Sequence, residues 1–255
     1  MANIKINGLI LRLNNFGDYH RYINILTEER GIISVFAKNI RKRKSKLNSV
    51  NQLFSYNEFE LFYYKERYSL DAASPIYIFK NLSQDIYLLT AAAQIAEIII
   101  DNAKEISDSP KMYALILRTF FELDRANKDP KTVTLASEIK LSSYLGYRPL
   151  LAHCYYCDDR LIDSQEVYFD FRNACLYCPK HYQKMKDQPL TNIRRISQSL
   201  LQTIRYIVYA DLEDTFSFEV SNSLQSELAA FTKLYLIEHF EKNYDKLSSL
   251  DQFKF

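Results

Sequence analysis

The chain of 255 residues carries 33 Lys and Arg against 31 Asp and Glu, a formal net charge of +2, and 47% of its residues are hydrophobic. This ordinary globular composition excludes a disordered or collagen-like chain. Only four glycines are present, far apart, which excludes a Walker A loop and a G-x-G-x-x-G dinucleotide turn. No apolar window reaches the roughly 18 residues of a membrane span, and Arg12 interrupts the first apolar run too early for a signal peptide. We therefore expect a cytoplasmic protein whose cysteines are reduced or metal-bound.

The positive charge is concentrated at the N-terminal end. Residues 1–80 contain 13 Lys and Arg but only 7 Asp and Glu, a net charge of +6. A cluster of cations in this region can neutralise several phosphates at once, which predicts a nucleic-acid contact; the alternative is a solvated charge run. The predicted contact residues occupy one nine-residue segment and are Lys38, Arg41, Lys42, Arg43, Lys44 and Lys46.

The same region has the alternation of a β-rich domain. Apolar, β-branched and aromatic residues predict five short strands, at residues 9–13, 22–26, 32–38, 52–64 and 68–73. Thr27-Glu28-Glu29-Arg30-Gly31 predicts a hairpin turn, with Gly31 at positive φ. Five strands within about 80 residues predict a small barrel such as an OB-fold, with an SH3-like barrel as the alternative. Alternation makes most of the flanking aromatics core residues, and one or two are expected to face a groove and stack bases; they are Phe36, Phe54, Tyr56, Phe59, Tyr63 and Tyr64.

From Leu82 onward the apolar period becomes helical. It predicts helices over residues 86–100, 109–121, 132–145, 193–207 and 224–235, with Ser109-Pro110 as one start and Gly146 as one end. The predicted fold class is therefore α+β and multidomain. It comprises an N-terminal OB-fold barrel (1–80), a helical domain in two parts (81–150 and 186–255) and an inserted zinc module (151–185).

All four cysteines lie in two C-x-x-C motifs, Cys154-Tyr155-Tyr156-Cys157 and Cys175-Leu176-Tyr177-Cys178, separated by 17 residues. This spacing predicts one tetrahedral zinc ion bound by Cys154, Cys157, Cys175 and Cys178; reduced thiol pairs or a redox centre are the alternatives. His153 and His181 flank the motifs, and either could replace a thiolate, but neither is in the predicted ligand set.

A site filled by four protein ligands has no open position, which favours structural zinc over catalytic zinc. The nearest enzyme hypothesis is a zinc deaminase, because His239-Phe240-Glu241 matches H-x-E. The match follows the cysteines instead of preceding them, so we expect no enzymatic activity.

The order of several motifs resembles the RecO family of bacterial DNA repair proteins over nearly the whole chain. The matching segments are Gly8-Leu9-Ile10-Leu11-Arg12, Phe16-Gly17-Asp18, Leu26-Thr27-Glu28-Glu29-Arg30-Gly31, Ala37-Lys38 and Leu145-Gly146-Tyr147-Arg148-Pro149-Leu150. Asn39-Ile40 stands where the family usually has Gly-Ala, and Leu53 replaces a proline. The first difference removes a flexible glycine from the basic segment.

The resemblance implies a recombination mediator without enzymatic activity that binds single- and double-stranded DNA. It implies annealing of strands coated with single-strand-binding protein, whose C-terminal tail docks on the helical domain. It also implies loading of RecA together with RecR, in a pathway that involves RecF, at a cytoplasmic, nucleoid-associated location. The alternative function, from another class, is an RNA-binding or ribosome-associated zinc protein, since barrels and zinc ribbons also serve RNA.

Overall fold

The computed structural model describes residues 2–45, 47, 50–103, 109–157, 160–161, 166–185 and 192–251. By its internal contacts the chain divides into two compact units, Met1–Pro130 with Lys246–Phe255, and Lys131–Asp245. This division differs from the four predicted segments, because the first helices and the last one belong to the same unit as the N-terminal strands. Among the residues described, no helix is both long and apolar enough to cross a membrane.

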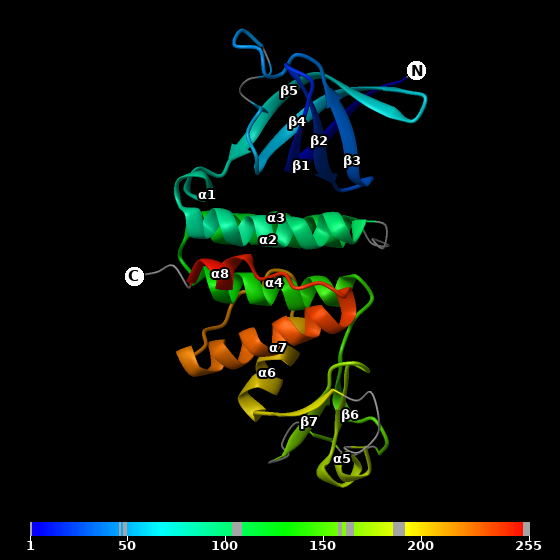
Figure 1. The fold of residues 1–255 in the computed structure, drawn as a ribbon, viewed down its shortest axis with the longest axis vertical. Coiled ribbons are helices and arrows are strands. Elements are labelled where there is room, and N and C mark those ends of the chain that lie inside the picture. The colour runs from blue at the N-terminus through cyan, green and yellow to red at the C-terminus, as the bar shows by residue number, and fades with distance from the viewer. Residues whose placement is uncertain are drawn as a thin grey trace. The chain divides into compact units, whose positions relative to one another are not determined.

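The first unit begins with a closed five-stranded barrel (Figure 1), whose strand order is β1-β2-β3-β5-β4. Strand β1 pairs with both β2 and β4 and so closes the barrel. Alternate residues point inward and form a core centred on Ile10, Ile23, Ile25 and Phe59, as the alternation predicts. The strands are β1 (Ala2–Phe16), β2 (His20–Thr27), β3 (Gly31–Ala37), β4 (Ser55–Tyr64) and β5 (Arg67–Ile78).

Gly8 lies where β1 changes partners, and it has no room for a side chain. A Cβ there would lie 2.9 Å from the carbonyl oxygen of Leu26 and still closer to the side chain of Ile25. We expect Gly8→Ala to destabilise the barrel by about 1–3 kcal/mol through overpacking. The exposed neighbour Asn7 offers a control, since Asn7→Ala should change stability by less than about 0.5 kcal/mol. Urea unfolding of both variants checks this, and equal midpoints would contradict the prediction.

Helices of the first unit cover one end of the barrel through aromatic contacts. Phe54, which follows the basic segment, packs edge-on against Phe120, with ring centroids 5.2 Å apart. The hydroxyls of Tyr56 and Tyr113 are hydrogen-bonded at 2.9 Å. These contacts explain why barrel and helices form one compact unit. The helices are α1 (Lys80–Gln84), α2 (Ile86–Asp101), α3 (Ser109–Arg125) and α8 (Lys246–Asp251).

The second unit consists of three longer helices and a four-stranded sheet of order β6-β8-β7-β9. Phe169 of the sheet packs against Phe231 and Tyr235 of one helix, and this aromatic cluster forms the core between sheet and helix. The elements are α4 (Pro130–Tyr144), β6 (Leu150–Cys154), β7 (Val167–Asp170), β8 (Cys175–Tyr177), α5 (Pro179–Met185), β9 (Ile193–Ile196), α6 (Gln198–Tyr209) and α7 (Asn222–Phe240).

Two boundaries in this unit test the predicted helices. The end of α4 is as predicted: Gly146 has φ +97°, and the amide of Tyr147 donates to the carbonyl of Ser142, as in a Schellman motif. The predicted start of a helix at residue 193 is wrong. Residues 193–196 form β9 and pair with β7, and α6 begins only after Ser197, whose side chain accepts from the amide of Leu200. The three-residue spacing of Ile193 and Ile196 fits a helix, but pairing with β7 outweighed this local period.

Candidate nucleic-acid interface and metal centre

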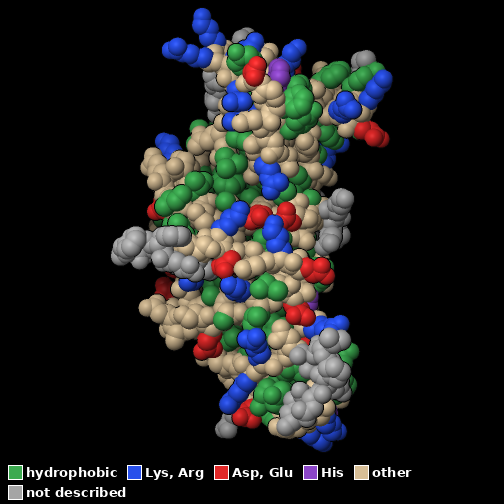
Figure 2. Space-filling model, in the orientation of Figure 1, with side chains coloured by type: hydrophobic (Ala, Val, Ile, Leu, Met, Phe, Trp, Pro, Cys, Tyr) green, Lys and Arg blue, Asp and Glu red, His purple; other side chains and the backbone are tan. Residues whose placement is uncertain are grey.

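The predicted basic segment forms the connection between β3 and β4, and Figure 2 shows Lys and Arg side chains projecting at this end of the barrel. Ile40 is completely buried and anchors the segment. The predicted contact residues around it are exposed, except that Lys46 lies outside the described residues. Within the described part of the chain, none of Lys38, Arg41, Lys42 and Lys44 forms an ion pair. Their charge is therefore available to an external anion.

Two backbone amides of the segment donate to the residues at which β2 begins, and a third amide closes a turn within the segment itself. The amide of Asn39 donates to Nδ1 of His20, that of Arg41 to the carbonyl of Tyr19, and that of Lys42 to the carbonyl of Asn39, each at 3.0 Å. Asn39 has φ +59°, in the left-handed region that asparagine adopts more readily than most residues. Asn39 thus adopts the left-handed conformation that a glycine would otherwise provide at this position.

Aromatic rings lie beside this basic segment on the outer face of β1, β2 and β3. Phe16 is 52% exposed and packs edge-on against Tyr22, which in turn lies 5.3 Å from Phe36. Tyr19 is also exposed, and Nζ of Lys42 lies 5.2 Å from the centroid of its ring. The structure therefore brings exposed cations and exposed aromatic rings together on one surface.

Sequence reasoning identified only part of this aromatic surface. Of the six aromatics that it named, Phe54 and Phe59 are buried in the core, and Tyr64 lies at the β4–β5 turn. It did not name Phe16, Tyr19 or Tyr22. For Tyr22 a signal existed, because it precedes the inward-facing Ile23 and must point outward.

A second positive group reinforces the basic segment. Arg21 donates through Nε to Oδ1 of Asn15 at 2.9 Å, which fixes its guanidinium on the outer face of β2. The pKa of Arg21 is lower than the usual arginine value. Burial is the larger cause, and the neighbouring charge of Arg41 is the smaller one. The influence of Arg41 on this pKa places two positive charges near each other, and an anion bound between them would relieve their repulsion.

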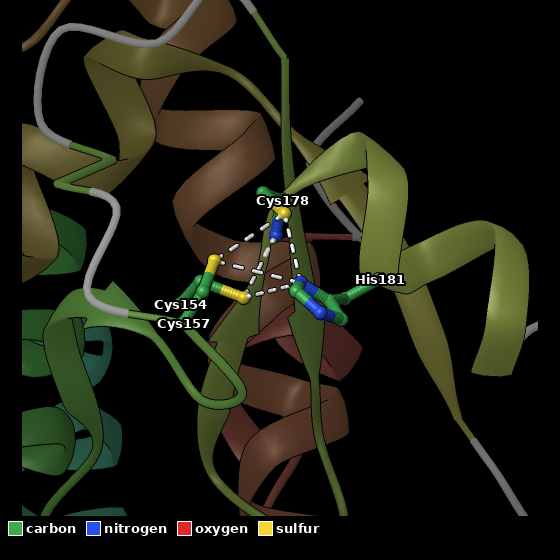
Figure 3. A group of neighbouring side chains, drawn as sticks. All are labelled: Cys154, Cys157, Cys178 and His181. Carbon is green, nitrogen blue, oxygen red and sulfur yellow. Dashed lines mark hydrogen bonds between the residues drawn. The ribbon is translucent and has the colours of Figure 1, made fainter.

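In the second unit, four side chains converge on one point (Figure 3): Cys154, Cys157, Cys178 and His181. Cys154 ends β6, Cys157 lies in the turn after it, Cys178 stands between β8 and α5, and His181 lies in the first turn of α5. Their ligand atoms all lie within 4.8 Å of one another. Such a group of three thiols and an imidazole is a typical donor set for zinc.

The distances between these atoms fit a tetrahedral zinc ion. Zn–S bonds of about 2.3 Å and Zn–N bonds of about 2.0–2.1 Å imply S···S edges of about 3.8 Å and S···N edges of about 3.6 Å. The sulfurs of Cys157 and Cys178 are 3.9 Å apart, and the three sulfurs lie 3.2–3.5 Å from Nδ1 of His181. The cluster can therefore hold one zinc ion with small adjustments.

Backbone amides around the sulfur of Cys154 favour its thiolate form. Burial alone would raise the pKa of Cys154, but amide donors around its sulfur, of which Cys178 N–H at 3.4 Å is the strongest, outweigh burial and lower the pKa. A thiolate is the form that binds zinc. The turns around the site thus favour the metal-binding state of this ligand.

The structure does not bring Cys175 into this group, which corrects the predicted four-cysteine ligand set. Cys175 begins β8, an extended segment that carries Cys178 about 10 Å away along the chain at roughly 3.3 Å per residue. Cys175 is buried, and burial is the main cause that raises its pKa to about 11, so it remains a thiol at neutral pH. The chain turns only after Cys178, and this turn brings in His181 instead.

The remaining histidines that the sequence singled out lie outside the cluster. His153 is exposed, and its backbone forms an isolated bridge with that of Arg160. His239 is on α7, where its ring contacts Tyr147 and Tyr235, and Glu241 follows the end of that helix. Neither residue of the H-x-E match belongs to the metal cluster, and the geometry gives the deaminase hypothesis no support.

Two family models together match almost the whole chain. "Recombination protein O N terminal" matches residues 1–79, and "Recombination protein O C terminal" matches residues 83–248. The second alone covers more than half of the chain. The chain belongs to the RecO family. Membership in the RecO family places it among DNA-binding proteins of DNA repair and recombination.

Full-length relatives agree with this assignment. The chain is 32% identical to the DNA repair protein RecO of Acetivibrio thermocellus over 257 residues, covering all of both chains. It is 28% identical to the protein of the same name from Caldicellulosiruptor saccharolyticus, covering 100% and 99% of the two chains. With that of Bacillus subtilis the identity is 26%, over 92% and 89%. The resemblance to RecO expected from the sequence is thus confirmed.

Proposed function

We propose that the protein is a recombination mediator without enzymatic activity that binds single- and double-stranded DNA and anneals complementary strands. It would act on DNA coated with single-strand-binding protein, contact the C-terminal tail of that protein, and load RecA together with RecR in the RecF pathway. We place it in the cytoplasm, at the nucleoid. Family membership supports the role in repair and recombination, and the surface of the barrel supports the proposed mechanism.

The observation that carries this proposal is that cations and exposed aromatic rings lie side by side on the surface of the barrel. Exposed Arg41, Lys42 and Lys44 would neutralise phosphates without reading sequence, because phosphates are the same at every nucleotide. Phe16 and Tyr22, in the adjacent cluster, would stack bases of a single strand, since every base offers an aromatic face. Contacts of this kind are exchangeable, so a bound strand can search for its complement while phosphate repulsion is screened.

We further propose that the barrel is an OB-fold. The strand order β1-β2-β3-β5-β4, with β1 pairing with β4, supports this assignment. OB-folds commonly bind oligonucleotides through one face and the adjoining loops. The basic segment between β3 and β4 and the turn between β1 and β2 would be the loops used here.

We propose a structural role for the metal centre, with Cys154, Cys157, Cys178 and His181 as ligands of one Zn²⁺. Four protein ligands leave no position for substrate or water. When bound, the ion would cross-link the end of β6 to the start of α5 and so stabilise the small sheet. The protein residues provide all of the DNA-binding chemistry in this proposal.

Strand annealing tests the proposal. Complementary fluorescent strands coated with single-strand-binding protein are mixed with and without the protein, and we expect the protein to accelerate pairing. Phe16→Ala with Tyr22→Ala should weaken single-strand binding at least fivefold, because each stacked base contributes about 1–3 kcal/mol. Tyr64→Ala, at an exposed ring on the β4–β5 turn, is the matched control and should bind normally.

Two results would count against this function. If the folded, zinc-loaded protein left the annealing rate unchanged, the mediator mechanism would be wrong. If RNA competed better than DNA of the same sequence, the alternative of an RNA-binding zinc protein would be favoured. Equal losses in the Tyr64→Ala control and the Phe16/Tyr22 variant would remove the aromatic cluster from the binding site.

A further inference from the structure

A shallow groove of about 280 Å³ runs along β6 in the second unit, beside the proposed metal centre, and Cys154 is one of the residues that line it. Leu150 and Tyr155 line it and are each 58% exposed, and Tyr209 at the end of α6 is 47% exposed. Among the described residues that line the groove there is no Asp or Glu. The groove therefore combines exposed aromatic and apolar surface with an absence of negative charge.

Two arginines border this groove and are ordered by one of its rings. The guanidinium of Arg148 lies 4.7 Å from the ring centroid of Tyr209, and that of Arg205 lies 5.9 Å from it. Arg205 also donates to the carbonyl of Leu151. Arg148 is exposed and forms no ion pair within the described part of the chain. A guanidinium held over a ring has lost much of its conformational freedom, so its binding to an anion costs little further entropy.

The neighbouring charges reinforce this positive character. Nζ of Lys140 donates to the carbonyls of Val208 and Ala210 at the end of α6. Burial and, to a smaller extent, the charge of Arg148 lower the pKa of Lys140, whereas the carboxylate of Asp211 raises it. Two guanidiniums thus lie against the ring of Tyr209, and the ammonium of Lys140 is hydrogen-bonded to the carbonyls of the residues before and after it.

We propose that this groove is a second contact site for single-stranded DNA, on a compact unit that does not contain the barrel. Arg148 binds a backbone phosphate, and a base enters the groove against Tyr155 and Leu150. The interleaving of arginine and exposed aromatic side chains matches a single strand, which offers charge and flat apolar faces at every nucleotide. The inference rests on the proposed function, because it adds a second strand contact to a protein that anneals two strands.

The test measures binding of a fluorescent oligothymidylate to the full-length, zinc-loaded protein. We expect Arg148→Ala and Tyr155→Leu each to weaken binding about fivefold or more, and to abolish the binding that remains in a variant lacking the basic charges at residues 41–44. Tyr155→Phe keeps a ring and should bind normally. Arg194→Ala removes the same charge from an exposed position on β9 and serves as the matched control. Zinc content and melting temperature verify that each variant is folded.

Tyr155 lies next to the zinc ligand Cys154, so Tyr155→Leu could lose the metal. In that case Arg148→Ala decides the test. If the basic-segment variant loses binding while Arg148→Ala behaves like Arg194→Ala, the groove is no strand contact and the proposed function stands. If the unaltered protein binds no single-stranded DNA, the proposed function and this inference both fail. Normal DNA binding by Arg148→Ala with loss of RecR binding would assign the groove to a protein partner and overturn the inference.

Discussion

Cys178→Ser and His181→Ala are each expected to abolish zinc binding and to melt the sheet of the second unit. The apparent binding free energy of structural zinc is about 10–16 kcal/mol at neutral pH, and most of it is folding free energy. A domain has only about 5–15 kcal/mol of net stability, so the loss of one ligand should unfold this part or make it insoluble. Metal analysis of the purified protein and thermal unfolding with and without a chelator measure both effects.

Cys175→Ala is the control that separates the two ligand sets. Its thiol lies outside the cluster, so this variant should keep one zinc ion per chain and lose only the small packing energy of a buried sulfur, about 1 kcal/mol. If instead Cys175→Ala lost the metal and His181→Ala kept it, the four-cysteine site would be correct. Zinc content therefore distinguishes the two ligand sets even if both variants are less soluble than the unaltered chain.

Replacing Arg41, Lys42, Arg43 and Lys44 together with alanine is expected to abolish strand annealing and to weaken single-strand binding at least about tenfold. Each phosphate contact on a single strand contributes about 0.7 to the slope of log K against log salt, so losing four contacts should reduce that slope by up to about 2.8. Ile40 remains in place, so the barrel should keep its stability. Binding isotherms at several salt concentrations measure the slope.

A control of equal charge distinguishes a local contact from an effect of net charge. Arg41→Ala with Lys42→Ala removes two charges from the basic segment, and Lys65→Ala with Arg67→Ala removes two from the exposed β4–β5 turn. We expect only the first pair to weaken binding strongly. Equal losses would mean that the general field of the barrel attracts DNA, and normal annealing by the fourfold variant would reduce the basic segment to a solvated charge run.

Much of the architecture could be predicted from local patterns. The alternation around Ile23 and Ile25 predicted strands that the barrel contains, and Gly146 marked the end of α4, because both signals depend on near neighbours in the chain. The order of motifs also predicted the family correctly. The predicted helix at residue 193 failed because strand pairing with β7, a contact between distant residues, outweighed a weak local period.

The candidate metal centre also combines features that the local sequence predicts with features that depend on the tertiary structure. The sequence by itself predicted a metal-binding segment, since two C-x-x-C motifs and flanking histidines lie within about thirty residues, and it located the cations of the basic segment. Only the tertiary structure decided that His181 joins Cys154, Cys157 and Cys178, because a ligand's direction depends on where β8 ends and the chain turns. In the same way, only the closed barrel decided that Phe16 and Tyr22 face outward beside those cations, since each strand's neighbours determine which of its faces is buried.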